Sequence, residues 1–89
     1  MAYCLGQTRN PAAAPPLRTT LLDFEEDDMV RHESAEALGA LNDIDSLEIL
    51  RQRRDDIYER EVVRETCEIA VGRIEWEISQ RASESVKTR

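Results

Sequence analysis

The chain has 89 residues, enough for one small domain, and its 19 acidic and 12 basic residues give a formal net charge of −7. Such an acidic chain lacks the positive surface that binds nucleic acids or anionic membranes, so neither partner is expected. No apolar stretch is long enough for a transmembrane helix, and the first residues lack the pattern of a secretory signal. The two cysteines therefore indicate reduced thiols, and we expect a cytoplasmic protein.

The first predicted element is a short helix in which Ala14, Leu17 and Leu21 share one apolar face. Pro15 and Pro16 fit its opening, because the first turn of a helix has backbone N–H groups without intrahelical partners and therefore tolerates proline. The spacing and the prolines together predict a helix that begins near these residues and packs through one side.

The second predicted helix follows an acidic turn at residues 23–28 and begins near Met29. Asp27 or Asp28 can serve as its N-cap, because a short carboxylate side chain accepts hydrogen bonds from the first backbone N–H groups. Residues at helical spacing form its predicted core stripe, namely Val30, Ser34, Ala37, Leu38 and Leu41.

Two further helices complete the predicted order. Ile44, Leu47 and Leu50 indicate a third, short helix, and a fourth is predicted over residues 59–80. The core stripe of the fourth helix has the same offsets as that of the second and consists of Val63, Cys67, Ala70, Val71 and Ile74. Residues 81–89 are polar and charged, and we expect them to form a disordered tail.

The helical pattern repeats at an interval of 33 residues, which is typical of solenoid proteins. Its three copies contain Cys-Leu-Gly at 4–6, Ala-Leu-Gly at 37–39 and Ala-Val-Gly at 70–72. These copies predict an all-α solenoid of HEAT-like α-hairpins over residues 1–80, with about two and a half repeats and a broken first one. The broken repeat leads us to expect marginal stability or self-association through the first helix.

Residues at equivalent repeat positions carry specific expectations. Gly39 and Gly72 lie inside helices, where glycine is unfavourable, so a close approach of a neighbouring helix is expected at both. Cys67 is expected to be a small core residue. Arg31 and Arg64 recur at helix starts, where we expect exposed ion pairs with acidic turn residues, each contributing less than about 1 kcal/mol.

The single histidine, His32, is followed by Glu33, and a helical projection places both on the face opposite the predicted core stripe. Imidazole and carboxylate groups are suitable ligands for iron, zinc or manganese. An isolated pair of this kind is more often a solvated polar face, and two ligands are fewer than the three of a 2-His-1-carboxylate iron site. The equivalent residues of the last copy are Glu65 and Thr66, so the pair does not recur there.

Three stretches resemble the deoxyhypusine hydroxylase family. Residues 29–41 resemble the last His–Glu repeat of that family, residues 62–70 the repeat that follows it, and residues 2–7 the sequence after the preceding His–Glu pair. Members are HEAT-repeat monooxygenases that use a di-iron centre and dioxygen to hydroxylate the deoxyhypusine residue of translation initiation factor 5A. The resemblance implies that His32 and Glu33 are ligands of Fe²⁺, and it covers residues 2–78.

The resemblance also implies an incomplete site, because the family has four His–Glu pairs in two solenoid halves and this chain has one. We therefore expect a fragment or truncated gene product that is inactive alone and retains negligible iron. Glu36 is a weaker candidate for binding a cationic substrate side chain, with a solvated surface carboxylate as the alternative. The alternative function is that of a non-catalytic HEAT-repeat module that binds a protein partner through its concave face.

Overall fold

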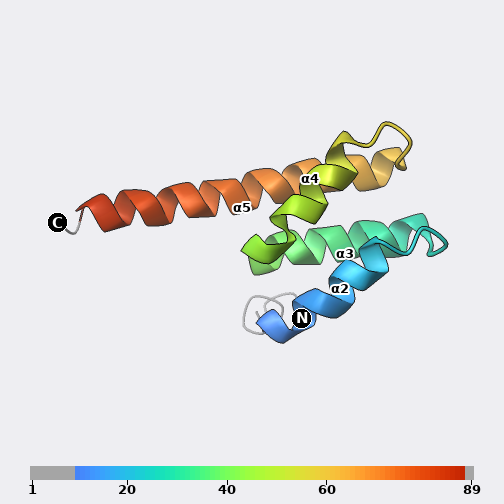
Figure 1. Ribbon diagram of the computed structural model, residues 1–89, viewed down its shortest axis with the longest axis horizontal. Coiled ribbons are helices and arrows are strands. Elements are labelled where there is room, and N and C mark those ends of the chain that lie inside the picture. The colour runs from blue at the N-terminus through green and yellow to red at the C-terminus, as the bar shows by residue number, and fades with distance from the viewer. Residues whose placement is uncertain (1–9, 88–89) are drawn as a thin grey trace.

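The computed structural model describes residues 10–87, and this range contains helices and no strands. The elements are the 3₁₀ turn η1 (Pro11–Ala13), α2 (Ala14–Leu21), α3 (Asp28–Leu41), the 3₁₀ turn η2 (Ile44–Ser46), α4 (Leu47–Asp55) and α5 (Glu61–Lys87). Figure 1 shows α3 and α5 running alongside each other, with α2 and α4 lying across them. The all-α class predicted from the sequence is confirmed, whereas the first copy at residues 4–6 lies outside the described residues.

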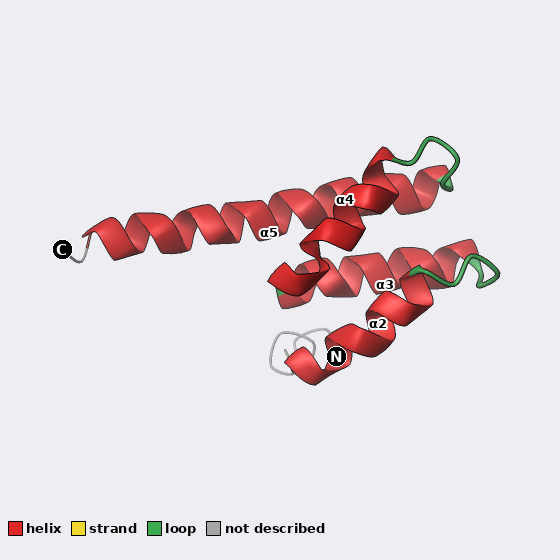
Figure 2. Ribbon diagram, viewed as in Figure 1, coloured by secondary structure: helices red, strands yellow, loops and turns green. Residues whose placement is uncertain are grey.

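The helices form two α-hairpins that repeat the same arrangement. Helix α2 packs on α3, α4 packs on α5, and the two hairpins are joined by packing of α3 against α5. Ala14 and Leu47 begin α2 and α4, and Asp28 and Glu61 begin α3 and α5, so both pairs of helices begin 33 residues apart. The repeat read from the sequence is therefore the structural repeat. Figure 2 shows that the α2–α3 and α4–α5 loops lie at the same end of the molecule.

Both ends of α3 are fixed by local hydrogen bonds. The carboxylate of Asp27 accepts a hydrogen bond of 2.7 Å from the backbone N–H of Met29, which confirms the predicted N-cap. Asn42 ends the helix in the left-handed region with a φ of 53°, and its N–H donates to the carbonyl oxygen of Gly39. Asparagine is one of the few residues other than glycine that adopts this conformation readily.

The core lies between the two hairpins, and the sequence predicted its two sides unequally. The stripe predicted for α5 is buried throughout. On α3 the buried face is rotated about the helix axis, relative to the predicted stripe, by slightly less than the angle between consecutive residues. Val30 was predicted to be buried but is 39% exposed, whereas Arg31 is 2% exposed. Ile44 was expected to join the core, but it begins η2 and is 49% exposed. The buried apolar residues are Ala14, Leu21, Ala35, Leu38, Leu47, Leu50, Val63, Cys67, Ala70, Val71 and Ile74.

Helix α5 is longer than the sequence predicted. It begins at Glu61, not at residue 59, and it continues to Lys87 through most of the stretch that was expected to be a disordered tail. Arg81 and Ala82 are exposed but are strong helix formers, and Arg81 pairs with Glu77 one turn earlier at 3.6 Å, so local interactions favour a helix that continues beyond the core. Residues 88 and 89 lie outside the described range. None of the described helices is both long and apolar enough to cross a membrane.

The two repeated glycines have different environments. A Cβ atom added to Gly39 would lie 2.9 Å from the Cβ and 3.0 Å from the Cα of Ala70, so α3 and α5 are in contact there through their backbones. A Cβ atom on Gly72 would meet no atom of the described residues within 4 Å. The expected close approach of a helix is therefore confirmed at Gly39 and wrong at Gly72.

Alanine substitutions at the two glycines are expected to change stability in opposite directions. Gly72→Ala should raise the free energy of unfolding by about 0.5–1 kcal/mol, because alanine is the better helix former and space is available. Gly39→Ala should lower it by about 1 kcal/mol, because overpacking against Ala70 outweighs the gain in helix propensity. Urea unfolding followed by circular dichroism measures both changes. Equal shifts of the same sign would contradict the close packing of α3 on α5.

Candidate functional site

His32 lies on α3 at the edge facing α5, where its side chain is half-buried. Its Nδ1 atom is hydrogen-bonded to Oγ1 of Thr66, and this hydroxyl in turn donates to the carbonyl oxygen of Val62 at 2.9 Å. The imidazole lines a shallow groove of about 150 Å³ between α3 and α5, together with Glu36, Gly39, Thr66, Ile69, Ala70 and Arg73. The ring is thus held on one side and borders a surface groove.

Glu33 is exposed and lines a neighbouring groove with Glu36, Ala37, Ala40 and Arg73. Glu36 and Arg73 border both grooves, so Glu36 stands between the grooves of His32 and Glu33. The sequence placed the pair on one surface away from the core. The structure leaves Glu33 facing solvent, as predicted, but turns the adjacent His32 toward α5, because consecutive helical residues point about 100° apart.

Within the described part of the chain, His32 and Glu33 are two potential metal ligands, which is fewer than a complete ligand set. No group of three or more His, Cys, Asp or Glu side chains is arranged to hold a metal ion among the described residues. Neither His32 nor Glu33 takes part in an ion pair with the rest of this range. An imidazole and a carboxylate without cationic partners are suitable donors for iron, so the pair fits part of an iron site.

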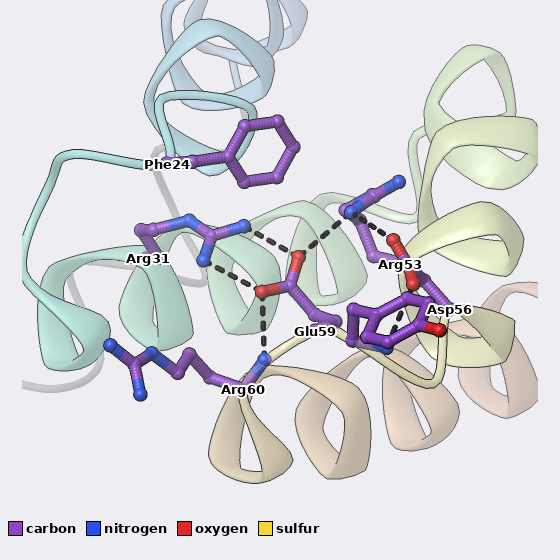
Figure 3. A pocket seen from close by; sticks show the side chains of 7 residues that line it. Phe24, Arg31, Arg53, Asp56, Glu59 and Arg60 are labelled. Atoms are coloured by element: carbon purple, nitrogen blue, oxygen red, sulfur yellow. Dashed lines mark hydrogen bonds and ion pairs between the residues drawn. The ribbon is translucent and has the colours of Figure 1, made fainter.

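An ion pair of Arg31 lies beside this site, and neither its burial nor its partner was predicted from the sequence. Arg31 donates two hydrogen bonds to the Glu59 carboxylate, of 2.8 and 2.7 Å, and its Nε donates to the carbonyl oxygen of Leu21 at 2.9 Å. The two charged side chains are 2% and 3% exposed. Figure 3 shows the parallel contacts between the guanidinium and the carboxylate. This bidentate geometry is the strongest form of the interaction between arginine and a carboxylate.

Arg53, Asp56 and Phe24 surround the pair of Arg31 and Glu59, and these five residues form a cluster. Arg53 donates to Glu59 at 3.0 Å and to Asp56 at 3.2 Å. The guanidinium carbons of Arg31 and Arg53 lie 4.8 and 5.1 Å from the centre of the Phe24 ring, a geometry that allows cation–π attraction (Figure 3). Phe24 belongs to the α2–α3 loop, whereas Asp56 and Glu59 belong to the α4–α5 loop. The cluster therefore ties together the two loops and the first turn of α3.

The cluster determines the charge state of Glu59. Burial alone would raise the pKa of this carboxyl group, but the hydrogen bonds from Arg31, the backbone N–H of Arg60 and Arg53 outweigh burial and lower the pKa from 4.5 to about 2. The hydrogen bond to Glu59 also raises the pKa of the Arg31 guanidinium. Both groups are therefore charged in the folded protein at neutral pH.

The expectations for the repeated arginines need correction. Arg31 does pair with an acidic loop residue, but the pair is buried and not exposed, so the value expected for surface pairs does not apply. Arg64 donates to the carbonyl oxygen of Arg54 at 3.2 Å, and it forms no ion pair with an acidic side chain among the residues that the structure describes. The recurrence of the Val-Arg pair was the available signal for Arg31, but Glu59 has no hydropathy signal, and 28 residues separate the partners.

The Arg31–Glu59 ion pair helps to position the candidate site, because Arg31 immediately precedes His32. Its three hydrogen bonds fix the first turns of α3, and the contact between Gly39 and Ala70 fixes the approach of α3 to α5 further along. The imidazole is therefore held between two rigid contacts. Cys67 lies in the core beneath, where burial raises the pKa of its thiol to about 12, which makes it an inert core residue, as expected.

Comparison with known proteins places this chain in a family. Residues 1–72 match the family described as HEAT repeats. The chain belongs to the HEAT-repeat family, in agreement with its stacked α-hairpins.

Its similar relatives are deoxyhypusine hydroxylases. The chain is 61% identical over 89 residues to the deoxyhypusine hydroxylase of Aspergillus fumigatus, an alignment that covers 99% of this chain and 27% of the relative. It is 59% identical over 88 residues to that of Phaeosphaeria nodorum, with 98% and 27% covered. The solved structure of human deoxyhypusine hydroxylase in complex with glycerol matches with a TM-score of 0.75 and 47% identity, over 91% of this chain and 27% of that one. The resemblance read from the sequence is confirmed, and the chain spans about a quarter of these relatives.

Proposed function

We propose that this chain is the part of a deoxyhypusine hydroxylase that provides one His–Glu pair, His32 and Glu33, to an iron centre. High identity over nearly the whole chain supports the assignment, and the 27% coverage of the relative leaves room for the remaining ligands in other segments. The substrate of the complete enzyme is then the deoxyhypusine form of translation initiation factor 5A. A cytoplasmic location remains a prediction.

The state of His32 is the observation that carries the proposal. Its Nδ1 atom is engaged by Thr66, so Nε2 is the ring nitrogen available to a metal. Glu33 follows directly and is exposed, without an ion-pair partner within the described range. Ferrous iron held by His32, Glu33 and ligands from other segments would supply the chemistry that activates dioxygen, and the protein would supply orientation and the exclusion of water.

The other side chains of the two grooves can orient a substrate. Deoxyhypusine carries a cationic amine, and Glu36 presents a carboxylate at the border of both grooves. Arg73 stands beside Glu36 and limits the negative charge of that surface. We assign Glu36 the role of attracting the amine, while the rigid first turns of α3 hold His32 and Glu33 in place.

A chimaera tests the proposal. The matching segment of the Aspergillus fumigatus relative is replaced by this chain, and formation of hypusine is measured on the deoxyhypusine form of factor 5A. The chimaera is expected to be active, and His32→Ala and Glu33→Ala are each expected to reduce the rate at least about 100-fold, because the loss of one ligand weakens iron binding at that position. Glu36→Ala is expected to raise KM with a smaller effect on kcat.

Glu68→Ala provides the matched control, because Glu68 is an exposed carboxylate of α5 outside the His32 groove. It should leave the rate unchanged. Full activity in the folded His32→Ala and Glu33→Ala chimaeras would contradict the proposal and favour the alternative of a non-catalytic binding module.

A further inference from the structure

We propose that Thr66 is a positioning residue that fixes His32 in the tautomer with the proton on Nδ1 and a free lone pair on Nε2. The inference rests on the proposed role of His32 as a metal ligand, and it concerns a residue of the neighbouring repeat. Thr66 follows Glu33 by 33 residues, so it occupies the repeat position equivalent to that carboxylate. The last repeat thus keeps no His–Glu pair but contributes to the pair before it.

The tautomer follows from the number of hydrogens on the hydroxyl group. A threonine hydroxyl has one hydrogen to donate and two lone pairs that accept. Oγ1 of Thr66 donates its hydrogen to the carbonyl oxygen of Val62 at 2.9 Å, so toward His32 it can only accept. The contact between Nδ1 and Oγ1 therefore requires the proton on Nδ1. In a neutral imidazole the other nitrogen, Nε2, then carries the lone pair that a metal needs.

The hydroxyl is held in this role by its surroundings. Thr66 is 8% exposed, and its branched side chain is fixed by the bond to the carbonyl four residues earlier. Gly39 allows α3 to approach α5 at Ala70, one turn beyond Thr66, so the imidazole reaches the hydroxyl. A ligating histidine generally donates its second ring N–H to such a partner, and loss of the partner weakens metal binding about 10–100-fold.

The experiment reads the tautomer directly, without metal. His32 is the only histidine of the chain, so its ring nitrogen signals in ¹⁵N NMR need no assignment against other histidines. With the imidazole neutral, this chain is expected to show a protonated Nδ1 and an unprotonated Nε2. Thr66→Val keeps the shape but removes the hydroxyl, and it should shift the ring toward the tautomer protonated on Nε2. Thr66→Ser keeps an acceptor and should restore the original pattern.

Thr20→Val is the matched control, because the Thr20 hydroxyl also donates to a carbonyl four residues earlier, that of Pro16, but Thr20 lies on α2 and does not line the groove of His32. It should leave the His32 signals unchanged, and circular dichroism reports whether each variant folds. A parent chain protonated mainly on Nε2 would overturn the inference even if Thr66→Val did not fold. A folded Thr66→Val variant with an unchanged tautomer would overturn it as well.

Iron retention separates this inference from the proposed function. In the chimaera, Thr66→Val is expected to weaken Fe²⁺ binding about 10–100-fold, with recovery in Thr66→Ser. Unchanged Fe²⁺ binding in Thr66→Val, in a chimaera that needs His32 for iron, overturns the positioning role alone. If His32→Ala also leaves iron binding unchanged, His32 is no ligand, and the proposed function fails together with the role built on it.

Discussion

Arg31→Met is expected to lower the free energy of unfolding by about 3–5 kcal/mol, the usual cost of removing one partner from a buried ion pair. The substitution leaves the Glu59 carboxylate buried without its bidentate partner, and it removes the hydrogen bond to the carbonyl oxygen of Leu21. This is a large fraction of the roughly 5–15 kcal/mol by which folded domains are stabilised. Urea unfolding of the parent and the variant measures the loss.

Arg51→Met is the matched control. Arg51 and Glu75 are also 2.7 Å apart, but their side chains are 43% and 47% exposed. Solvent screens such a pair, so its loss should cost less than about 1 kcal/mol. The double variant Arg31→Met/Glu59→Leu replaces the buried pair by apolar groups and should recover much of the lost stability. Equal losses in Arg31→Met and Arg51→Met would show that burial does not determine the strength of the pair.

Acidification is expected to remove about 3 kcal/mol of stability through Glu59 alone. The pKa of its carboxyl group is about 2 in the folded protein against an ordinary value of 4.5, and each unit corresponds to about 1.4 kcal/mol. Because the pKa of Glu59 is lower in the folded protein than in the unfolded chain, the unfolded chain takes up the proton first as the pH falls. The contribution is therefore fully present above about pH 5 and is lost toward about pH 2.

Comparison with Glu59→Gln isolates this contribution from the other carboxylates. The parent should be more stable than Glu59→Gln at neutral pH, and the difference should shrink as the pH falls from about 5 to about 2. Glu75→Gln, at the exposed pair, should show no comparable convergence. A direct ¹³C NMR titration of the Glu59 carboxyl group in the parent measures the pKa of this group in the folded protein. A midpoint near 4.5 would contradict the account of the cluster.

Hydropathy predicted the parts of the fold that depend on spacing. The 33-residue interval gave the two hairpins, and the core stripe of α5 is buried as expected, because apolar side chains determine that face. The prediction was wrong for part of the α3 stripe, because a charged residue, Arg31, occupies a buried position on this helix. An arginine becomes buried when a distant carboxylate meets it, and one sequence does not show which carboxylate that is.

The sequence indicated which residues belong to the candidate site, but it did not indicate which residues they contact. His32 and Glu33 followed from residue type and from resemblance, whereas the contact of His32 with Thr66 depends on the distance between α3 and α5. That distance is set where Gly39 meets Ala70, and Gly72 has the same place in the repeat without any such neighbour. Equivalent positions in a repeat can thus have different neighbours, because each hairpin packs on a different surface.

The iron content of the purified chimaera tests the central claim most directly. The parent chimaera should retain the iron content of the unmodified relative, and His32→Ala should lose at least half of it, because one iron position loses a ligand. Glu68→Ala should retain all of it. Full iron content in a folded His32→Ala chimaera would contradict the assignment of His32 as a ligand.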